Sequence, residues 1–559
     1  MLSIHERPET HHVATERSED IPTLIAHMRR MGIPQILDRH VPTRAYWGNL
    51  SVGWTAVVWL AHLLSCSDHK ASTVQQWVSA HPETLRWCTG SPVTSADVGI
   101  DQLHDVLIGL SHNARWQAIE TDLNQHALRT WTLSAEQVHL RLYEGRSWHI
   151  SPRGSLQIAK THHRRARTLR PSIMLATLNP SNMPLVTWSF PGDRVPAVSF
   201  TEMLEQISRI LPRQPYRFVG DALTAIELRG AIHMRNGKYL FLLPDALVDP
   251  AHSFTDRSLP DVSALFSASN SDHANLSAVR GIEWYVPASA EIDGTTVSWH
   301  ERRIAMRAPV QAHLLEESLR TRLKRAEEAL LALCERKRGK RRLRSLDAVQ
   351  EAANAILDSY QVRGLLRLNF AEQIEERLVR RYRGRPTGVR VERNVRLTVS
   401  TDTDALTRAT QRLGWQIFGS NIPQQELSAD RSLSLAASPV PGFERLHGRP
   451  LSLTPHEVHT PELEIGLIRL LALGLRTLAL LETIARLQLI REGLLSAIDD
   501  ERALSRTTSE RLLEAFRDIM LVPGAHRLPR SATPLSLLQK RVLHLLMLSP
   551  DIYHAGDAA

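Results

Sequence analysis

The sequence predicts an α/β protein in which a mixed sheet is preceded and followed by helices. Two observations carry this prediction. Before about residue 130 and again after about residue 460, apolar residues recur three and four positions apart, as they do along helices. Between these parts, short β-type segments alternate with helical ones, which is typical of an α/β sheet. We expect four parts, residues 1–130, 131–245, 246–425 and 426–559.

Composition narrows the class of protein. The chain has 559 residues, 43% hydrophobic and 23% charged, which indicates a globular protein of two to four domains and not a disordered one. Its formal charge is +9, with arginine much commoner than lysine. A polyanion such as DNA suits this balance, because arginine binds phosphate through two donors, although many basic proteins bind no polyanion.

Cysteine usage and hydropathy indicate a cytoplasmic protein without a membrane partner. The three cysteines are Cys66, Cys88 and Cys334. They form no CxxC pair, which argues against a disulfide framework and a zinc site. The N-terminus is polar, without a secretory segment. Arg469 and Arg476 interrupt the most apolar stretch, so we expect a core helix with a solvated or DNA-facing edge there, and not a membrane span.

The first part of the chain, residues 1–130, is predicted to be a separate helical domain. The expected helices cover residues 21–31, 50–64, 72–79, 98–110 and 116–128. Such a domain is a candidate for binding DNA ends, but it contains no sharp helix-turn-helix motif.

The second part, residues 131–245, has the alternating pattern of apolar and polar residues that is typical of β-strands. Strands are expected at 137–143, 172–178 and 183–190, and the turn NPSN joins the last two as a hairpin. A helix at 198–211, a strand ending at Val219, a helix from Thr224 to His233 and a strand from Lys238 follow. Three strands followed by alternating helices and strands is the order of a ribonuclease-H-like fold.

Asp221 is the central candidate for chemistry. It follows the strand that ends at Val219, and Thr224 and Glu227 have the spacing of a capping box that would begin the next helix. In open α/β sheets, ligands and metals gather at the carboxyl ends of strands. Asp221 is therefore a candidate metal ligand and catalytic residue, and the alternative is an ordinary turn residue.

The third part, residues 246–425, is predicted to be an insertion. Two helices, about 319–333 and 346–360, should form an antiparallel hairpin, and the run 336–344 at its tip carries seven basic residues. That tip is either a solvated helix end or a phosphate contact. Alternating segments at 365–370, 377–383 and 389–400 predict a small antiparallel sheet with a basic face. Helices at 465–489, 509–520 and 535–548 complete the chain.

Five stretches resemble a known family. They are MLATLNPSNMPLVTWSFPG from Met174, FVGDALTAIELRG from Phe218, WHERR from Trp299, RLHGRPLSLTP with the helix after it from Arg445, and TPLSLLQKRVLHLL from Thr533. Together they resemble bacterial insertion-sequence transposases of the DDE type, in the branch with a long insertion between the second and third acids. The resemblance spans roughly residue 130 to the end of the chain.

The resemblance implies a chemistry and a set of partners. In this family, two Mg²⁺ ions, or Mn²⁺, are held by three carboxylates and assist cleavage and strand transfer at the ends of an insertion sequence. It also implies DNA as the partner and a homodimer, because two DNA ends must be paired.

Two of the three acid positions depart from the family pattern. Arg141 stands where the first acid is expected, and Val440 stands at the third position, between Pro439 and Pro441. Only Asp221 is matched. A fixed cation within about 4 Å of a metal position opposes the metal by roughly 1–4 kcal/mol. We therefore expect DNA binding with lost or crippled catalysis.

Two alternatives stay open at this point. Glu144 and Glu444 lie close in sequence to the two vacated positions and would complete an active transposase if they reached Asp221. Alternatively, the protein is a scaffold or regulator that keeps the fold without binding DNA.

The candidate DNA contacts are Trp299 and twelve basic residues, Arg164, Arg165, Arg302, Arg303, Arg336, Lys337, Arg338, Lys340, Arg341, Arg342, Arg445 and Arg449. Trp299 would stack on a base, and the alternative is a tryptophan packed under the β-type part of the insertion. His162 and His163 are weak candidates for metal ligands, because adjacent residues in a strand point to opposite faces.

Overall fold

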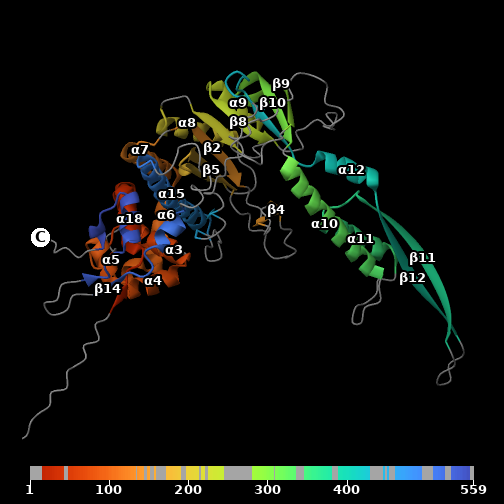
Figure 1. Cartoon of the computed structure of the whole chain (residues 1–559), viewed down its shortest axis with the longest axis horizontal. Coiled ribbons are helices and arrows are strands. Elements are labelled where there is room, and N and C mark those ends of the chain that lie inside the picture. Colours follow the sequence, from red (N-terminus) through yellow and green to blue (C-terminus); the bar gives the residue numbers. More distant parts are fainter. Residues whose placement is uncertain are drawn as a thin grey trace, which may run out of the picture.

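A computed structural model describes residues 15–42, 48–68, 70–133, 135–143, 148–150, 156–158, 172–190, 197–212, 216–220, 225–243, 280–307, 309–334, 345–379, 388–428, 445–446, 450–451, 460–493, 508–522 and 531–553. The protein is mixed α/β. A large mixed sheet lies between a helical body and an elongated arm (Figure 1).

The helical body contains both ends of the described chain. Its N-terminal helices are α1 (Ile21–Arg30), α2 (Ile33–His40), α3 (Val52–Cys66), α4 (Ala71–Ala80), α5 (Pro82–Thr89), α6 (Ile100–Ser111) and α7 (Asn113–Trp131). The five predicted helices are confirmed, and α2 and α5 are additional. Both additional helices carry a proline in their first turn. Proline is tolerated there, although in the sequence it had the appearance of a helix breaker.

The N-terminal helices do not have a core of their own. They share one hydrophobic core with α15 (Pro461–Arg491), α17 (Ser509–Glu514) and α18 (Leu537–Leu545). Strand β1 (Glu16–Arg17) also pairs with β14 (Met520–Val522), which pairs with β15 (Ser531–Ala532). The red and blue ends of the chain therefore lie together in Figure 1. The expected separate N-terminal domain is wrong in this respect.

Helix α15 is the centre of the body. Thr460 begins it, its side chain accepting a hydrogen bond from the Leu463 backbone, and every residue from 466 to 485 is buried. Gly466 allows α6 to approach closely, because a Cβ there would lie 2.2 Å from the Leu107 carbonyl oxygen. A helix that is buried all round belongs to a core. Among the helices of the described residues, none combines the length and apolar character needed to cross a membrane.

The sheet has eight strands in the order β6-β5-β2-β7-β8-β13-β10-β9. Their bounds are β2 (Gln137–Tyr143), β5 (Ser172–Asn179), β6 (Met183–Phe190), β7 (Arg217–Gly220), β8 (Lys238–Leu243), β9 (Arg280–Ile292), β10 (Thr295–Arg307) and β13 (Trp415–Ser420). Strands β2, β7 and β8 run parallel, and all other neighbours are antiparallel. All strands predicted between 137 and 243 are confirmed, as is the β5–β6 hairpin. Strands β3 (Trp148–Ile150) and β4 (Leu156–Ile158) form a separate antiparallel pair.

Two helices connect the strands of this half of the sheet. Helix α8 (Ala197–Ile210) lies between β6 and β7 in sequence, and α9 (Ile226–Met234) lies between β7 and β8. Helix α9 begins after Ala225, whose side chain makes no capping hydrogen bond. The predicted capping box from Thr224 is therefore wrong as the start of this helix, and Thr224 itself lies outside the described residues.

Strands β9, β10 and β13 come from the predicted insertion and extend the sheet beyond β8. Strand β9 pairs with β10, β10 with β13, and β13 with β8. Asp293 and Gly294 join β9 to β10, with φ angles of 50° and 78°. An Asp-Gly step between alternating segments is a strong hairpin signal, so this element was predictable from sequence.

The arm is built from the rest of the insertion. Its elements are α10 (Pro309–Cys334), α11 (Leu346–Ser359), β11 (Leu366–Val379), β12 (Gly388–Thr401) and α12 (Thr403–Arg412). It has its own hydrophobic cluster, which includes Leu323 and Leu330 of α10 and Leu357 of α11. Strands β11 and β12 form an antiparallel ribbon of 14 residue pairs. The predicted helical hairpin is confirmed. The predicted antiparallel sheet is a ribbon of two strands, in which most of the segment 365–370 and the start of 377–383 belong to the single strand β11. The run 336–344 lies outside the described residues.

The predicted helix at 509–520 is shorter than expected. Helix α17 ends at Glu514, and the chain has entered β14 at Met520. The other C-terminal helices, α15 and α18, are confirmed.

Candidate functional site

The candidate site lies where the parallel strands β2 and β7 end. Their register pairs Leu140 with Gly220. Arg141 is therefore the first residue of β2 beyond this pairing, and Asp221 is the next residue of the chain after β7. Parallel strands end at the same edge of a sheet, which is the edge where ligands are usually bound.

Arg141 and His139 are the described polar residues at this end of β2. Arg141 is half-buried, and His139 is 5% exposed. Burial, with the nearby charge of Arg141, lowers the pKa of His139 to about 4. The histidine is therefore neutral near pH 7 and the charge here is that of Arg141, which favours an anion over a cation as the ligand.

The acids proposed for catalysis cannot be placed. Asp221, Glu144 and Glu444, with Val440 at the third family position, all lie outside the described residues. Within the described ranges, no three His, Cys, Asp or Glu side chains come together in a way that would hold a metal ion. Arg141 and His139 do not fit a Mg²⁺ or Mn²⁺ centre, because such ions require oxygen ligands and Arg141 is a fixed cation.

The side chain of Trp299 lies inside the protein. It is 6% exposed, and its Nε1 donates to the Tyr239 hydroxyl at 2.9 Å. Tyr239 in turn donates to Oε1 of Glu301 at 2.6 Å, and Arg229 of α9 pairs with the same carboxylate at 2.8 Å. The predicted base-stacking role of Trp299 is wrong, since the ring belongs to a buried network that holds α9 against β8 and β10.

The two arginines of the same stretch are also engaged inside the protein. Arg302 is 1% exposed, pairs with Glu283 and donates to the Leu427 carbonyl at 2.7 Å. Arg303 pairs with Glu301 at 2.6 Å, and its side chain is 15% exposed. The prediction that Arg302 contacts DNA is wrong, because its guanidinium is buried and neutralised. Arg303 shares the Glu301 carboxylate with Arg229.

Arg445 connects helices at the C-terminal side of the body. Its Nε donates to Oε1 of Glu510 at 2.9 Å, and it forms a second ion pair with Glu482 of α15. Burial works against its charge, but Glu482 and Glu510 together raise the pKa of Arg445. Two carboxylates already occupy this guanidinium, so the structure gives it a role in holding α17 to α15.

The remaining basic candidates lie outside the described residues. They are Arg164, Arg165, Arg336, Lys337, Arg338, Lys340, Arg341, Arg342 and Arg449. His162 and His163 lie outside as well.

Arg469 and Arg476 do not form a solvated or DNA-facing edge. They are 3% and 2% exposed. Arg469 donates to the Leu110 carbonyl at 2.7 Å, and Arg476 donates to Oδ1 of Asn124 at 2.7 Å. That part of the prediction is wrong, because the neighbouring α6 and α7 provide acceptors that the sequence of α15 does not reveal.

A buried carboxylate that sequence reasoning missed lies beside these arginines. Glu120 of α7 is 1% exposed and accepts hydrogen bonds from the Thr187 backbone at 2.8 Å and from Gln206 at 3.0 Å. Burial raises its pKa to about 8, although Arg476 and Arg469 oppose the shift. Two arginines seven positions apart in an apolar helix were the available signal that a buried acid faces them.

Comparison with known proteins gives no family assignment for this chain. No protein-family model matches its sequence, and no curated protein matches it. The functional argument therefore depends on the residues and the fold of the chain itself.

Proposed function

We propose that the protein is a DNA-binding relative of the DDE transposases with a ribonuclease-H-like core, and that its metal-dependent cleavage is impaired or lost. The strand order is the observation that carries the proposal. Counted along the chain from β2, the strands β6-β5-β2-β7-β8 have the order 3-2-1-4-5. Strands 1, 4 and 5 are parallel, strand 2 is antiparallel to strand 1, and strand 3 is antiparallel to strand 2, so strand 3 runs in the same direction as strand 1. This order is the one expected for a ribonuclease-H-like sheet, and it supports the proposed core.

The position of Arg141 supports the loss of catalysis. In such a core, the first two acids follow adjacent parallel strands, which here are β2 and β7. Arg141 is at that end of β2, and Asp221 follows β7 in sequence. A guanidinium there suits a DNA phosphate, which it binds through two charge-assisted hydrogen bonds. Arg141 would therefore hold a phosphate at the place where an active relative holds a metal.

The arm supports DNA as the partner. Strand β11 ends at Val379 and β12 begins at Gly388, and the eight residues between them include four arginines and no acid. Helix α10 ends at Cys334, just before the basic run 336–344. Such a density of arginine and lysine in two connections of one arm suits the backbone of a duplex. We propose the ends of an insertion sequence as that duplex, held by a homodimer.

DNA affinity tests the binding part of the proposal. Fluorescence anisotropy with a labelled duplex should show binding that weakens as salt rises. Arg141→Gln should lower the affinity and reduce the slope of log affinity against log salt by about 1. Arg209→Gln is the matched control, since Arg209 is an exposed arginine of α8. Absence of DNA affinity at low salt would contradict the proposal and favour a scaffold that keeps only the fold.

A cleavage assay tests the catalytic part. With Mg²⁺ or Mn²⁺, we expect no cleavage of DNA above background, and Asp221→Ala should not change this result. Cleavage that disappears in Asp221→Ala would contradict the loss of catalysis. The further variants Glu144→Gln and Glu444→Gln would then show whether those acids complete the site.

A further inference from the structure

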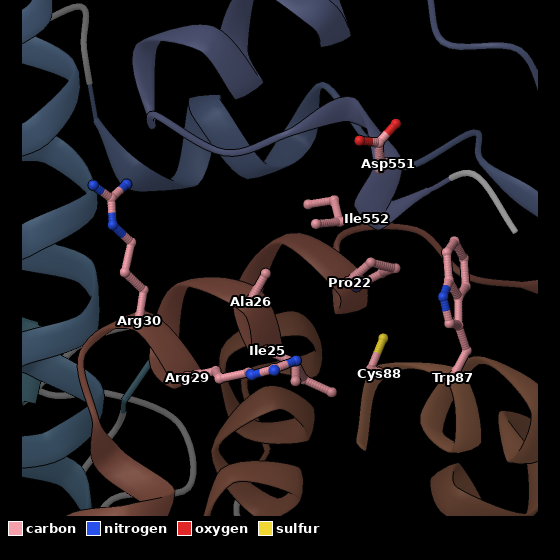
Figure 2. Close-up of a pocket in the computed structure, with 9 residues that line it drawn as sticks. All are labelled: Pro22, Ile25, Ala26, Arg29, Arg30, Trp87, Cys88, Asp551 and Ile552. Atoms are coloured by element: carbon pink, nitrogen blue, oxygen red, sulfur yellow. The ribbon is translucent and has the colours of Figure 1, made fainter. Parts of the chain in front are cut away.

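A cavity of about 530 Å³ lies in the helical body, far along the chain from Arg141 and Asp221. It opens to solvent and lies between α1, the end of α5 and the short helix η3 (Pro550–Ile552), as Figure 2 shows. Its lining residues are Pro22, Ile25, Ala26, Arg29, Arg30, Trp87, Cys88, Asp551 and Ile552. The volume lies in the range of small-ligand sites in proteins.

The two arginines of the cavity differ in what they bind. Arg30 donates to the Met547 carbonyl at 2.7 Å and lies over the Trp131 ring, with its Cζ 5.9 Å from the ring centre. It therefore has a structural role between α1 and the C-terminal helices. Arg29 is exposed. Among the described residues, no hydrogen bond or ion pair engages its guanidinium, so a cation without a partner lines the cavity.

Trp87 supplies an aromatic wall. Its side chain is half-buried, and Figure 2 shows it standing at one end of the cavity, beside the Cys88 sulfur that points inward. Burial raises the pKa of Cys88 to about 12, so the thiol is neutral and acts as apolar surface. Ile25, Pro22 and Ile552 extend this apolar lining.

Asp551 adds an acceptor on the opposite side. It is exposed, and its Oδ2 accepts a hydrogen bond from the Ser549 hydroxyl at 2.7 Å. A ligand with only negative charge would be repelled by this carboxylate. The cavity therefore suits a ligand that offers an anion to Arg29, a flat ring to Trp87 and N–H donors to Asp551.

We propose that this cavity binds a nucleotide, with the base stacked on Trp87 and hydrogen-bonded to Asp551 and the phosphate held by Arg29. Bases with exocyclic or ring N–H groups, such as guanine, match the carboxylate acceptor. Stacking on an aromatic side chain and contact with arginine are the usual means of binding unpaired nucleotides. The nucleotide is either free or part of an unpaired DNA strand. The inference does not depend on the proposed function.

The test is isothermal titration calorimetry on the full chain with 2′-deoxyguanosine 5′-monophosphate, deoxyguanosine and inorganic phosphate. Arg29→Gln should weaken monophosphate binding at least tenfold and leave deoxyguanosine binding unchanged. Trp87→Leu should weaken both nucleoside probes. Arg86→Gln is the matched control, because Arg86 is an exposed arginine of α5 outside the cavity lining, and it should leave binding unchanged.

A competition experiment distinguishes the two sources of the nucleotide. Displacement of the monophosphate by a short single-stranded oligonucleotide supports a DNA strand as the ligand, whereas binding of the monophosphate alone supports a free nucleotide. Thermal unfolding of each variant shows whether it is folded. If Trp87→Leu is unfolded, the test rests on whether Arg29→Gln weakens binding of the monophosphate. The inference is overturned if the monophosphate does not bind at millimolar concentration, or if Arg29→Gln and Arg86→Gln bind it equally. Loss of duplex DNA affinity alone leaves it standing.

Discussion

Arg476 donates a hydrogen bond of 2.7 Å to Oδ1 of Asn124, across 352 positions of the chain. A second nitrogen of the same guanidinium donates to the Pro184 carbonyl. One side chain of α15 thereby connects α7 of the N-terminal part to β6 of the sheet. The buried carboxylate of Glu120 lies within the electrostatic reach of this guanidinium.

Replacement of Arg476 should destabilise the helical body strongly. Arg476→Met would remove both hydrogen bonds and leave the buried oxygens of Asn124 and Pro184 without this donor, at a cost of about 1–3 kcal/mol for each. We expect a clearly lower thermal unfolding midpoint by circular dichroism. Arg491→Met, at the exposed end of α15, should change stability by less than about 0.5 kcal/mol. Equal midpoints for the two variants would contradict a central role for Arg476.

Glu120 should make stability depend on pH. Burial raises its folded pKa to about 8 from a reference value of 4.5. The folded state therefore binds this proton more tightly than the unfolded state does. Its contribution is complete below about pH 4.5 and is lost as the pH rises through 8. In Glu120→Gln, unfolding midpoints measured from pH 5 to 9 should lose this component of their pH dependence.

The pH dependence of stability must be compared between the unchanged protein and Glu120→Gln, because His27 makes stability change with pH in the opposite direction. Burial, with Arg30 nearby, lowers the pKa of His27 to about 3. Its contribution is present above the unfolded value near 6.5 and is lost as the pH falls. A Glu120→Gln profile parallel to that of the unchanged protein would contradict the raised pKa of Glu120.

Arg302 should be needed for folding and not for DNA binding. Arg302→Met leaves the Glu283 carboxylate, whose side chain is 7% exposed, without its cation, which should cost about 3–5 kcal/mol. The double variant Arg302→Met with Glu283→Gln should recover part of this loss. Duplex affinity per folded molecule should stay unchanged in both. An affinity loss in a variant with an unchanged unfolding midpoint would restore Arg302 as a DNA contact.

The arm should unfold independently of the rest of the protein. Leu330 is 0% exposed within the separate cluster of the arm. Leu330→Ala should destabilise the arm by about 2–5 kcal/mol through lost burial and a cavity. Hydrogen exchange should accelerate in α10 and α11 and not in α15. Leu331, its neighbour at 44% exposed, gives the control variant Leu331→Ala, for which we expect little change.

The sequence by itself determined the local elements of the sheet. The strand 137–143, the hairpin around NPSN and the helix that begins near 198 were predicted almost to the residue, because side-chain period and turn chemistry act over a few positions. It also placed Asp221 after a strand and Arg141 near the end of another. Both are statements about neighbours in the chain.

Only the tertiary structure decided which charges face water. The stretch from Trp299 to Arg303 had the sequence of a basic surface segment. Inside the protein, however, Trp299 contacts Tyr239, Arg302 pairs with Glu283, and Arg303 pairs with Glu301. Arg469 and Arg476 likewise find acceptors on α6, α7 and β6. The exposure of a cation depends on what the fold places beside it, and those partners here lie from 2 to more than 350 positions away. A pattern within one segment carries no information about such partners, so burial and pairing follow only from the fold.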